Sequence, residues 1–373
     1  MTKTNTPNKP PSWWKTDLKE VGACLATVRQ GKVEELARSP GGRPVFAVAY
    51  GPAPVVRATS NFSGAMGCGD PKAYKDESQP QSVIFVAGCH GAEAEAVNGA
   101  MNLIQAMETG RDYAGIDRSK LVSLAKRYRL VIIPVLNPDG RARSPASMLG
   151  VPPEQAEHIN QGTWKDGTPV GWPACKRYQP LDPAAVSFLG GYPNDAGYNL
   201  MHDATPGDIR SAEVAALLKL VDRERADLIL HLHSHSTPGD ILPPSHGMLD
   251  LQRKRILAYR RRLETFFASR GLEVTHIPAR DPADTWLCPF NLTSLTSLIS
   301  GALSPTFEQP DGSNPKHPRD YPTMLEESMA VFELFLKQGL VERFSPRMEL
   351  FNTMFDAGAE PATYSRESWL ITP

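Results

Sequence analysis

The sequence predicts an α/β protein, a three-layer α/β/α fold around a mixed, mostly parallel central sheet. Apolar runs of strand length alternate with segments whose apolar residues recur at helical spacing. Residues 83–87 and 128–136 are apolar almost without interruption, as in strands that helices cover on both faces. At 373 residues, the chain has the length of one large α/β domain with insertions.

The first elements are less regular. Residues 1–11 are polar and contain proline, so we expect them to be disordered. Residues 16–38 carry apolar side chains at mostly helical intervals, which predicts a helix or a broken pair of helices, and 44–50 read as a strand. The composition of residues 51–81 predicts an irregular connection before the next strand. It includes the glycine-rich stretch 64–69, which lacks the features of a phosphate-binding loop and predicts a flexible loop.

Further along, strands and helices alternate. Helices are expected over 92–107, 207–223, 249–270 and 321–337, and strands over 83–87, 128–136, 226–233, 273–278 and 299–307. Residues 137–199 are rich in proline, glycine and tryptophan and show little periodicity. Irregular segments of this length are usually functional, so we expect substrate contacts there.

The composition is that of an ordinary soluble globular protein. A net charge of -1 gives no general attraction to nucleic acid or anionic membranes, so neither is expected as a partner. The scattered cysteines form no C-x-x-C pair and predict a reducing compartment. No apolar run has membrane-spanning length, and no secretory apolar region stands at the start, so a cytoplasmic location is expected. The cysteines are Cys24, Cys68, Cys89, Cys175 and Cys288.

A possible metal-binding motif follows the apolar run 83–87. The chain breaks at Gly88 and then places His90 and Glu93 three residues apart as a helical pattern begins. Such side chains project from the carboxyl end of the sheet, where open α/β folds bind ligands. The alternative is that Glu93 binds no metal and is an acidic residue in the first turn of a helix, where the helix dipole favours a negative charge.

Three histidines provide a second source of metal ligands. In a strand, His231 and His233 face the same side, and His235 lies just past the strand end. A catalytic zinc site needs three protein ligands and one open position, and two histidines with one glutamate form an established set. The alternative is that these histidines cap a strand and bond to loops.

A further acidic residue, Glu308, lies at the end of an apolar segment. A metal ion lowers the pKa of water and polarises a carbonyl, and a nearby carboxylate takes the proton and returns it to the leaving nitrogen. Glu308 is the candidate for that carboxylate. Its alternative is a solvated acid at a strand end.

Together these segments resemble the zinc carboxypeptidases and the related aspartoacylase and succinylglutamate desuccinylase enzymes. The resemblance spans roughly residues 45–336. It implies an N-terminal extension and helix (1–43), a zinc carboxypeptidase-like catalytic domain (44–338) and a C-terminal extension (339–373). The segments that carry it are His90-Gly91-Ala92-Glu93, Asn137-Pro138-Asp139-Gly140, His231-Leu232-His233-Ser234 and Thr306-Phe307-Glu308.

By this resemblance, His90, Glu93 and His233 would bind Zn²⁺, and Glu308 would act as general base and acid. The resemblance selects His233 because His231 falls where the family often has an aspartate. His231 and His235 remain alternative ligands.

The sequence departs from the family where the substrate is held. The family's G-x-D-L-N-R segment, whose Asn and Arg grip a terminal carboxylate, reads Gly-Tyr-Asn-Leu-Met-His-Asp over 197–203. This segment therefore lacks an arginine that could bind a carboxylate through two hydrogen bonds. Met201 and His202 occupy the corresponding positions. His202 and Arg280 are the candidates for substrate binding, and His276 is a further polar candidate near the position of the family's substrate-facing tyrosine. For the arginine that stabilises the oxyanion we choose Arg177 over Arg141 and Arg143.

The sequence thus predicts a zinc-dependent hydrolase that cleaves a peptide or peptide-like amide bond. One alternative is a zinc-dependent deacylase of N-acyl amino acids. Another is a zinc-binding scaffold without catalysis, against which the presence of Glu308 argues.

Overall fold

A computed structural model describes residues 9–57, 61–67, 70–278 and 287–354. Seven strands form the central sheet in the order β1-β2-β4-β3-β7-β9-β8, and β5 and β6 form a separate two-stranded antiparallel sheet. The strands are β1 (Lys32–Arg38), β2 (Pro44–Tyr50), β3 (Ser82–Val86), β4 (Arg129–Ile133), β5 (Thr163–Trp164), β6 (Val186–Phe188), β7 (Leu228–His235), β8 (Asp240–Ile241) and β9 (Thr306–Pro310). The α-helices are α1 (Leu18–Leu25), α2 (Phe62–Gly67), α3 (Pro71–Tyr74), α4 (Ala94–Thr109), α5 (Ser119–Ala125), α6 (Pro138–Ala142), α7 (Pro153–Gln161), α8 (Ala212–Glu224), α9 (Asp250–Ala268), α10 (Leu292–Ser300), α11 (Tyr321–Val341) and α12 (Arg347–Met354).

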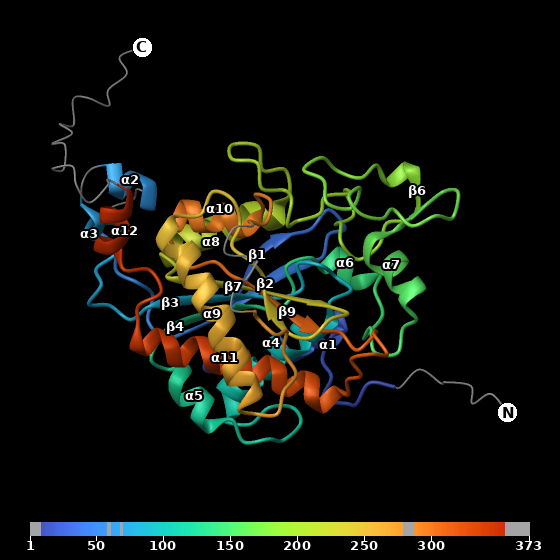
Figure 1. Cartoon of the computed structure of the whole chain (residues 1–373), viewed down its shortest axis with the longest axis horizontal. Coiled ribbons are helices and arrows are strands. Elements are labelled where there is room, and N and C mark those ends of the chain that lie inside the picture. The colour runs from blue at the N-terminus through green and yellow to red at the C-terminus, as the bar shows by residue number, and fades with distance from the viewer. Residues whose placement is uncertain (1–8, 58–60, 68–69, 279–286, 355–373) are drawn as a thin grey trace, which may run out of the picture.

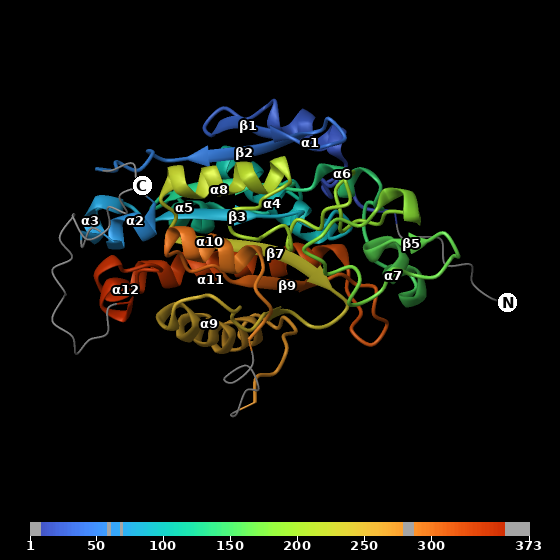
Figure 2. The ribbon, with the colours of Figure 1, turned by 90° about the horizontal axis from the view of Figure 1, so that it is seen from above.

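The sheet is mixed, with its parallel part in the middle. Strands β4, β3, β7 and β9 run parallel, whereas β1, β2 and β8 pair antiparallel at the edges. Helices α4, α5, α9 and α11 pack on one face, and α8 and α10 on the other (Figures 1 and 2). This arrangement confirms the predicted three-layer fold.

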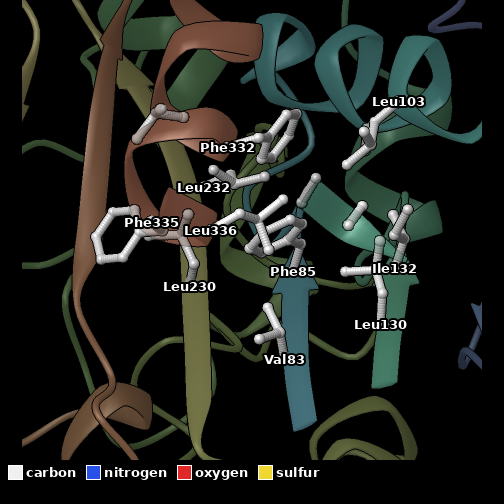
Figure 3. Packing of buried hydrophobic residues seen from close by; sticks show 14 of the residues in the cluster. Val83, Phe85, Leu103, Leu130, Ile132, Leu230, Leu232, Phe332, Phe335 and Leu336 are labelled. Carbon is white, nitrogen blue, oxygen red and sulfur yellow. The ribbon is translucent and has the colours of Figure 1, made fainter. Parts of the chain in front are cut away.

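Buried apolar side chains fix the central strands between these layers. Every residue of β3 is buried, which explains its uninterrupted apolar sequence. On the α4 and α11 side, the ring of Phe85 stacks on that of Phe332 with centroids 4.8 Å apart (Figure 3). Leu230 and Ile132 of the neighbouring strands face the same cluster. The carboxyl ends of β3 and β7 are therefore rigid supports for side chains that follow them.

Three predicted elements differ from the structure. Residues 16–38 contain α1 and then strand β1, whose register shifts between Glu35 and Ala37. This bulge interrupts the alternation that would have indicated a strand. Residues 299–307 contain the end of α10 and the start of β9, and 273–278 form no strand but a single bridge between Val274 and Gly239.

The glycine-rich stretch also differs in part, because 62–67 form α2, while 68–69 lie outside the described residues. The segment 137–199 holds α6, α7 and the two-stranded sheet of β5 and β6. It gathers at the right of Figures 1 and 2, at the end to which the arrowhead of β7 points. Within the described part of the chain, none of the helices combines the length and hydropathy needed to span a membrane.

A buried ion cluster holds the opposite end of the sheet. Asp227, directly before β7, accepts hydrogen bonds from Lys75 Nζ at 2.6 Å, from Arg347 Nη2 at 3.1 Å and from the backbone N–H of Ser82 at 2.8 Å. All three charged side chains are buried. The cluster connects α3, the central sheet and α12.

We expect Asp227→Asn to lower the free energy of unfolding by about 3–5 kcal/mol, because two buried cations lose their carboxylate. Urea unfolding measures this change. Glu34→Gln is the matched control, since it breaks the exposed pair with Arg223 and should cost at most about 1 kcal/mol. Equal losses in the two variants would show that the cluster contributes no more than a surface pair.

Candidate metal and catalytic site

The turn after β3 sets the position of the first two candidate ligands. Gly88 adopts a left-handed conformation with φ of 61°, which glycine adopts without strain. Its carbonyl accepts a hydrogen bond from Asn137 N–H, so the segment after β4 fixes this turn. His90 follows, and Glu93 immediately precedes α4. Both side chains therefore start from a backbone that two neighbouring segments hold.

The third candidate ligand comes from the adjacent strand. His233 lies near the carboxyl end of β7, which pairs in parallel with β3. From β3 the chain continues to β4 on one side, whereas from β7 it continues to β8 and β9 on the other. Open α/β sheets have their ligand crevice where connections diverge in this way.

His90, Glu93 and His233 converge on one point. Nδ1 of His90 lies 2.8 Å from Oε1 of Glu93, and Nδ1 of His233 lies 2.7 Å from Oε2. The ligand atoms of the three residues lie within 4.8 Å of one another, and all three residues are buried. Despite its short length, the contact between Glu93 Oε2 and His233 Nδ1 does not have hydrogen-bond geometry, and Nε2 of His233 has no hydrogen-bond partner among the described residues.

The hydrogen bonds of His90 leave its Nδ1 suited to binding a metal ion. Asn199 donates its amide N–H to the carbonyl of Cys175 at 2.8 Å, so its Oδ1 faces His90 Nε2 at 3.1 Å and requires an N–H there. Burial, above all, lowers the pKa of His90 to about 4, so the ring is neutral and Nδ1 carries a lone pair. A metal ion that binds this lone pair would also be within reach of Glu93, whose Oε1 lies 2.8 Å from Nδ1. Two imidazoles and one carboxylate fit zinc.

The other two histidines of β7 lie outside this group. His231 faces α10, where its Nε2 lies 3.5 Å from Oγ1 of Thr296, and burial lowers its pKa to about 3. His235 contacts Thr237. Among the described residues, the three-ligand group contains His233 and neither of these alternatives.

Glu308 lies beside the ligand group. It stands opposite His233 in the parallel pairing of β9 with β7. Because Phe307 and Leu232 point into the core on the α9 and α11 side, Glu308 and His233 both point to the other face. Burial, with the charge of Glu93, raises the pKa of Glu308 despite the opposing charges of nearby histidines. A carboxylate with a raised pKa is suited to accept and return a proton near neutral pH.

Two of the three candidate arginines are engaged elsewhere, and the third is exposed. Arg141 donates to the carbonyl of Gly91 at 2.7 Å and so supports the backbone between the two ligands. Arg143 donates to the carbonyl of Gly190 at 2.5 Å and pairs with Asp195. Arg177 is exposed and lines a small pocket with Gln179 and Leu181. The role of Arg177 in stabilising the oxyanion stays a prediction. Within the described part of the chain, Arg177 forms no hydrogen bond or ion pair with His90, Glu93 or His233.

Three residues of the site escaped the sequence analysis. Asn199 orients His90, Tyr192 stacks on the His90 ring with centroids 3.9 Å apart, and the Nζ of Lys176 lies 4.6 Å from the centroid of Tyr192. All three belong to the irregular segment. The resemblance of residues 197–203 to G-x-D-L-N-R was a signal for Asn199, but no pattern indicated Lys176 or Tyr192.

The predicted substrate-binding residues differ in their environments. His202 is buried, and burial, with the charges of Lys176 and His90, lowers its pKa to about 3. Its ring meets that of Tyr178 edge-on at 5.7 Å. His276 is exposed and pairs with Glu264 at 2.6 Å. Arg280 lies outside the described residues.

The model of the zinc carboxypeptidase family matches residues 29–238 of this chain. The metallo-carboxypeptidase from Burkholderia cenocepacia aligns over 87% of this chain and 69% of its own, with a TM-score of 0.54 and 17% identity. Bovine thrombin-activatable fibrinolysis inhibitor, in complex with tick carboxypeptidase inhibitor, aligns over 89% of this chain and 99% of its own, with a TM-score of 0.51 and 12% identity. No match was found among the curated proteins. These two likenesses show the fold, and the family model covers more than half of the sequence. The chain therefore belongs to the zinc carboxypeptidase family.

Proposed function

We propose that this chain is a zinc-dependent hydrolase of the metallocarboxypeptidase type that cleaves a peptide or peptide-like amide bond. The observation that carries the proposal is the convergence of His90, Glu93 and His233 on one buried point beside Glu308. These three residues would hold zinc. Zinc, when bound, supplies Lewis acidity toward a carbonyl oxygen and makes water more acidic.

Glu308 is the proton carrier in this proposal. Its carboxylate takes a proton from the attacking water and returns it to the nitrogen that leaves, so the residue ends each cycle in its starting form. Asn199 keeps the proton of His90 on Nε2, which leaves Nδ1 free to bind the metal.

The substrate-binding region departs from the family's pattern, which leaves room for a second candidate. Met201 and the neutral His202 occupy the place where the family has a paired Asn and Arg, so no guanidinium grips a carboxylate there. A zinc-dependent deacylase of N-acyl amino acids, with the same metal and the same Glu308, is that candidate. We also propose a cytoplasmic location, which Cys24, Cys89, Cys175 and Cys288 support because all four are free thiols.

A hydrolysis panel tests the proposal. Zinc-loaded protein is given peptides with free carboxyl ends, the same peptides with amidated ends, and N-acyl amino acids, and the released amines are quantified. We expect zinc-dependent cleavage of the free-ended peptides. Cleavage of N-acyl amino acids alone would select the deacylase, and no cleavage of any substrate would leave the non-catalytic scaffold.

A further inference from the structure

The ring of Tyr192 lies against the imidazole of His90. The two ring centroids are 3.9 Å apart and the ring planes differ by 20°, so the rings are stacked. Contacts between aromatic rings are stabilising beyond the area that they bury. A metal ion would bind the lone pair of His90 Nδ1, which lies in the plane of the imidazole. Tyr192, above that plane, therefore contacts the ring without competing for the metal.

The backbone next to this ring is fixed to the turn that carries the first two ligands. The N–H of Gly91 donates to the carbonyl of Gly191 at 2.7 Å, and the N–H of Tyr192 donates to a carbonyl of α7 at 2.9 Å. Asn137 Nδ2 donates to the carbonyl of Tyr192 at 2.9 Å. The stacked ring and the turn before α4 therefore belong to one hydrogen-bonded unit.

The close approach of these segments requires glycine. A Cβ on Gly91 would lie 1.9 Å from the carbonyl carbon of Gly140, and a Cβ on Gly191 would lie 2.7 Å from the backbone nitrogen of Ala92. Larger residues at these two positions would push the segments apart. The glycines thus let the irregular segment come close enough for the rings to stack.

The hydrogen bond to Asn199 does not by itself fix the plane of the His90 ring. Oδ1 of Asn199 accepts from Nε2 at 3.1 Å, which holds one atom of the ring and leaves the plane free to tilt about it. The contact with Tyr192 restricts this tilt. Nδ1 then stays directed at Oε1 of Glu93, 2.8 Å away.

From these contacts we propose that Tyr192 is a positioning residue for the metal site. Its ring holds the imidazole of His90 in the plane in which Nδ1 faces the metal, as groups around a metal ligand do when they orient it. The role belongs to the ring and not to the phenol hydroxyl, because stacking needs no polar atom. It rests on the metal site of the proposed function but does not depend on hydrolysis.

Zinc affinities of the full chain test this proposal. Tyr192→Leu keeps an apolar side chain but removes the ring, and should weaken zinc binding by about 10-fold, the lower end of the effect of losing a group that supports a ligand. Tyr192→Met is prepared beside it, so that a second variant without the ring is available if the first does not fold. Tyr192→Phe keeps the ring and should bind zinc as tightly as the unmodified chain. Competition with a chromogenic chelator, without substrate, gives the affinities.

A second measurement separates positioning from general packing. Cobalt(II) in place of zinc absorbs visible light in a way that depends on the geometry of its ligands. We expect the spectrum to change in Tyr192→Leu and to be retained in Tyr192→Phe. Tyr113→Leu is the matched control, because it makes the same change in a partly buried ring that also contacts a lysine, with Lys15 Nζ 5.8 Å from its centroid. It should alter neither the zinc affinity nor the spectrum.

Two results would overturn the role of Tyr192. One is an unchanged zinc affinity and cobalt spectrum in Tyr192→Leu, even with a lower unfolding temperature, because the ring would then serve packing alone. The other is an equal loss of affinity in Tyr192→Leu and Tyr192→Phe, which would assign the effect to the hydroxyl. Failure of the unmodified chain to bind zinc would contradict both this role and the proposed function, whereas zinc binding without hydrolysis would contradict the proposed function alone.

Discussion

Replacing Glu308 by Gln is expected to lower turnover by about 10²–10⁴-fold while the protein keeps its zinc. The amide has nearly the shape of the carboxylate but cannot take a proton from water or return it to the leaving nitrogen. Because Glu308 lies beside the ligand group and outside it, its loss should not change the metal content. Steady-state hydrolysis of the best substrate of the panel, with zinc content measured on the same samples, gives the result.

Glu333→Gln is the matched control for this substitution. It makes the same chemical change on α11, in a glutamate that pairs with Arg270 and Lys337. We expect its turnover to equal that of the unmodified chain. Turnover of the Glu308→Gln variant within a few-fold of the unmodified chain, with zinc retained, would contradict the role of Glu308.

Local sequence predicted the buried parts of the fold and missed elements that distant partners determine. The strand 83–87 was predictable because helices cover both faces and require apolar residues throughout. Residues 32–38 contain good helix formers, including Glu34 and Glu35, but pairing with β2 makes them an edge strand. The prediction for 299–307 was wrong because α10 ends at Ser300, with Gly301 in a left-handed conformation as its C-cap, only a few residues before β9 begins.

The candidate site likewise contains some residues that the local sequence predicts and others that it does not. His90 and Glu93 follow β3, and His233 lies within β7. The apolar pattern predicts the positions of both strands, so the convergence of the three residues could be expected from the sequence. Lys176 and Tyr192 come from an irregular segment that has no periodicity to place them. Their approach to His90 depends on individual hydrogen bonds between loops, which no local pattern encodes.

Replacing His233 by Ala is expected to weaken zinc binding by more than about 100-fold, since even the loss of a partner that only supports a ligand costs 10- to 100-fold. With two ligands left, the site lacks the three protein ligands that a catalytic zinc ion requires. Hydrolysis should be lost together with the metal.

His231→Ala is the matched control, because it removes a buried imidazole two residues earlier on the same face of β7. Circular dichroism and thermal unfolding first establish that both variants are folded. The decisive measurement is the zinc content of the unmodified chain and of both variants after dialysis against a limiting zinc buffer. We expect one equivalent in the unmodified chain, one in His231→Ala and almost none in His233→Ala. One equivalent retained by folded His233→Ala would contradict the assignment of the metal site.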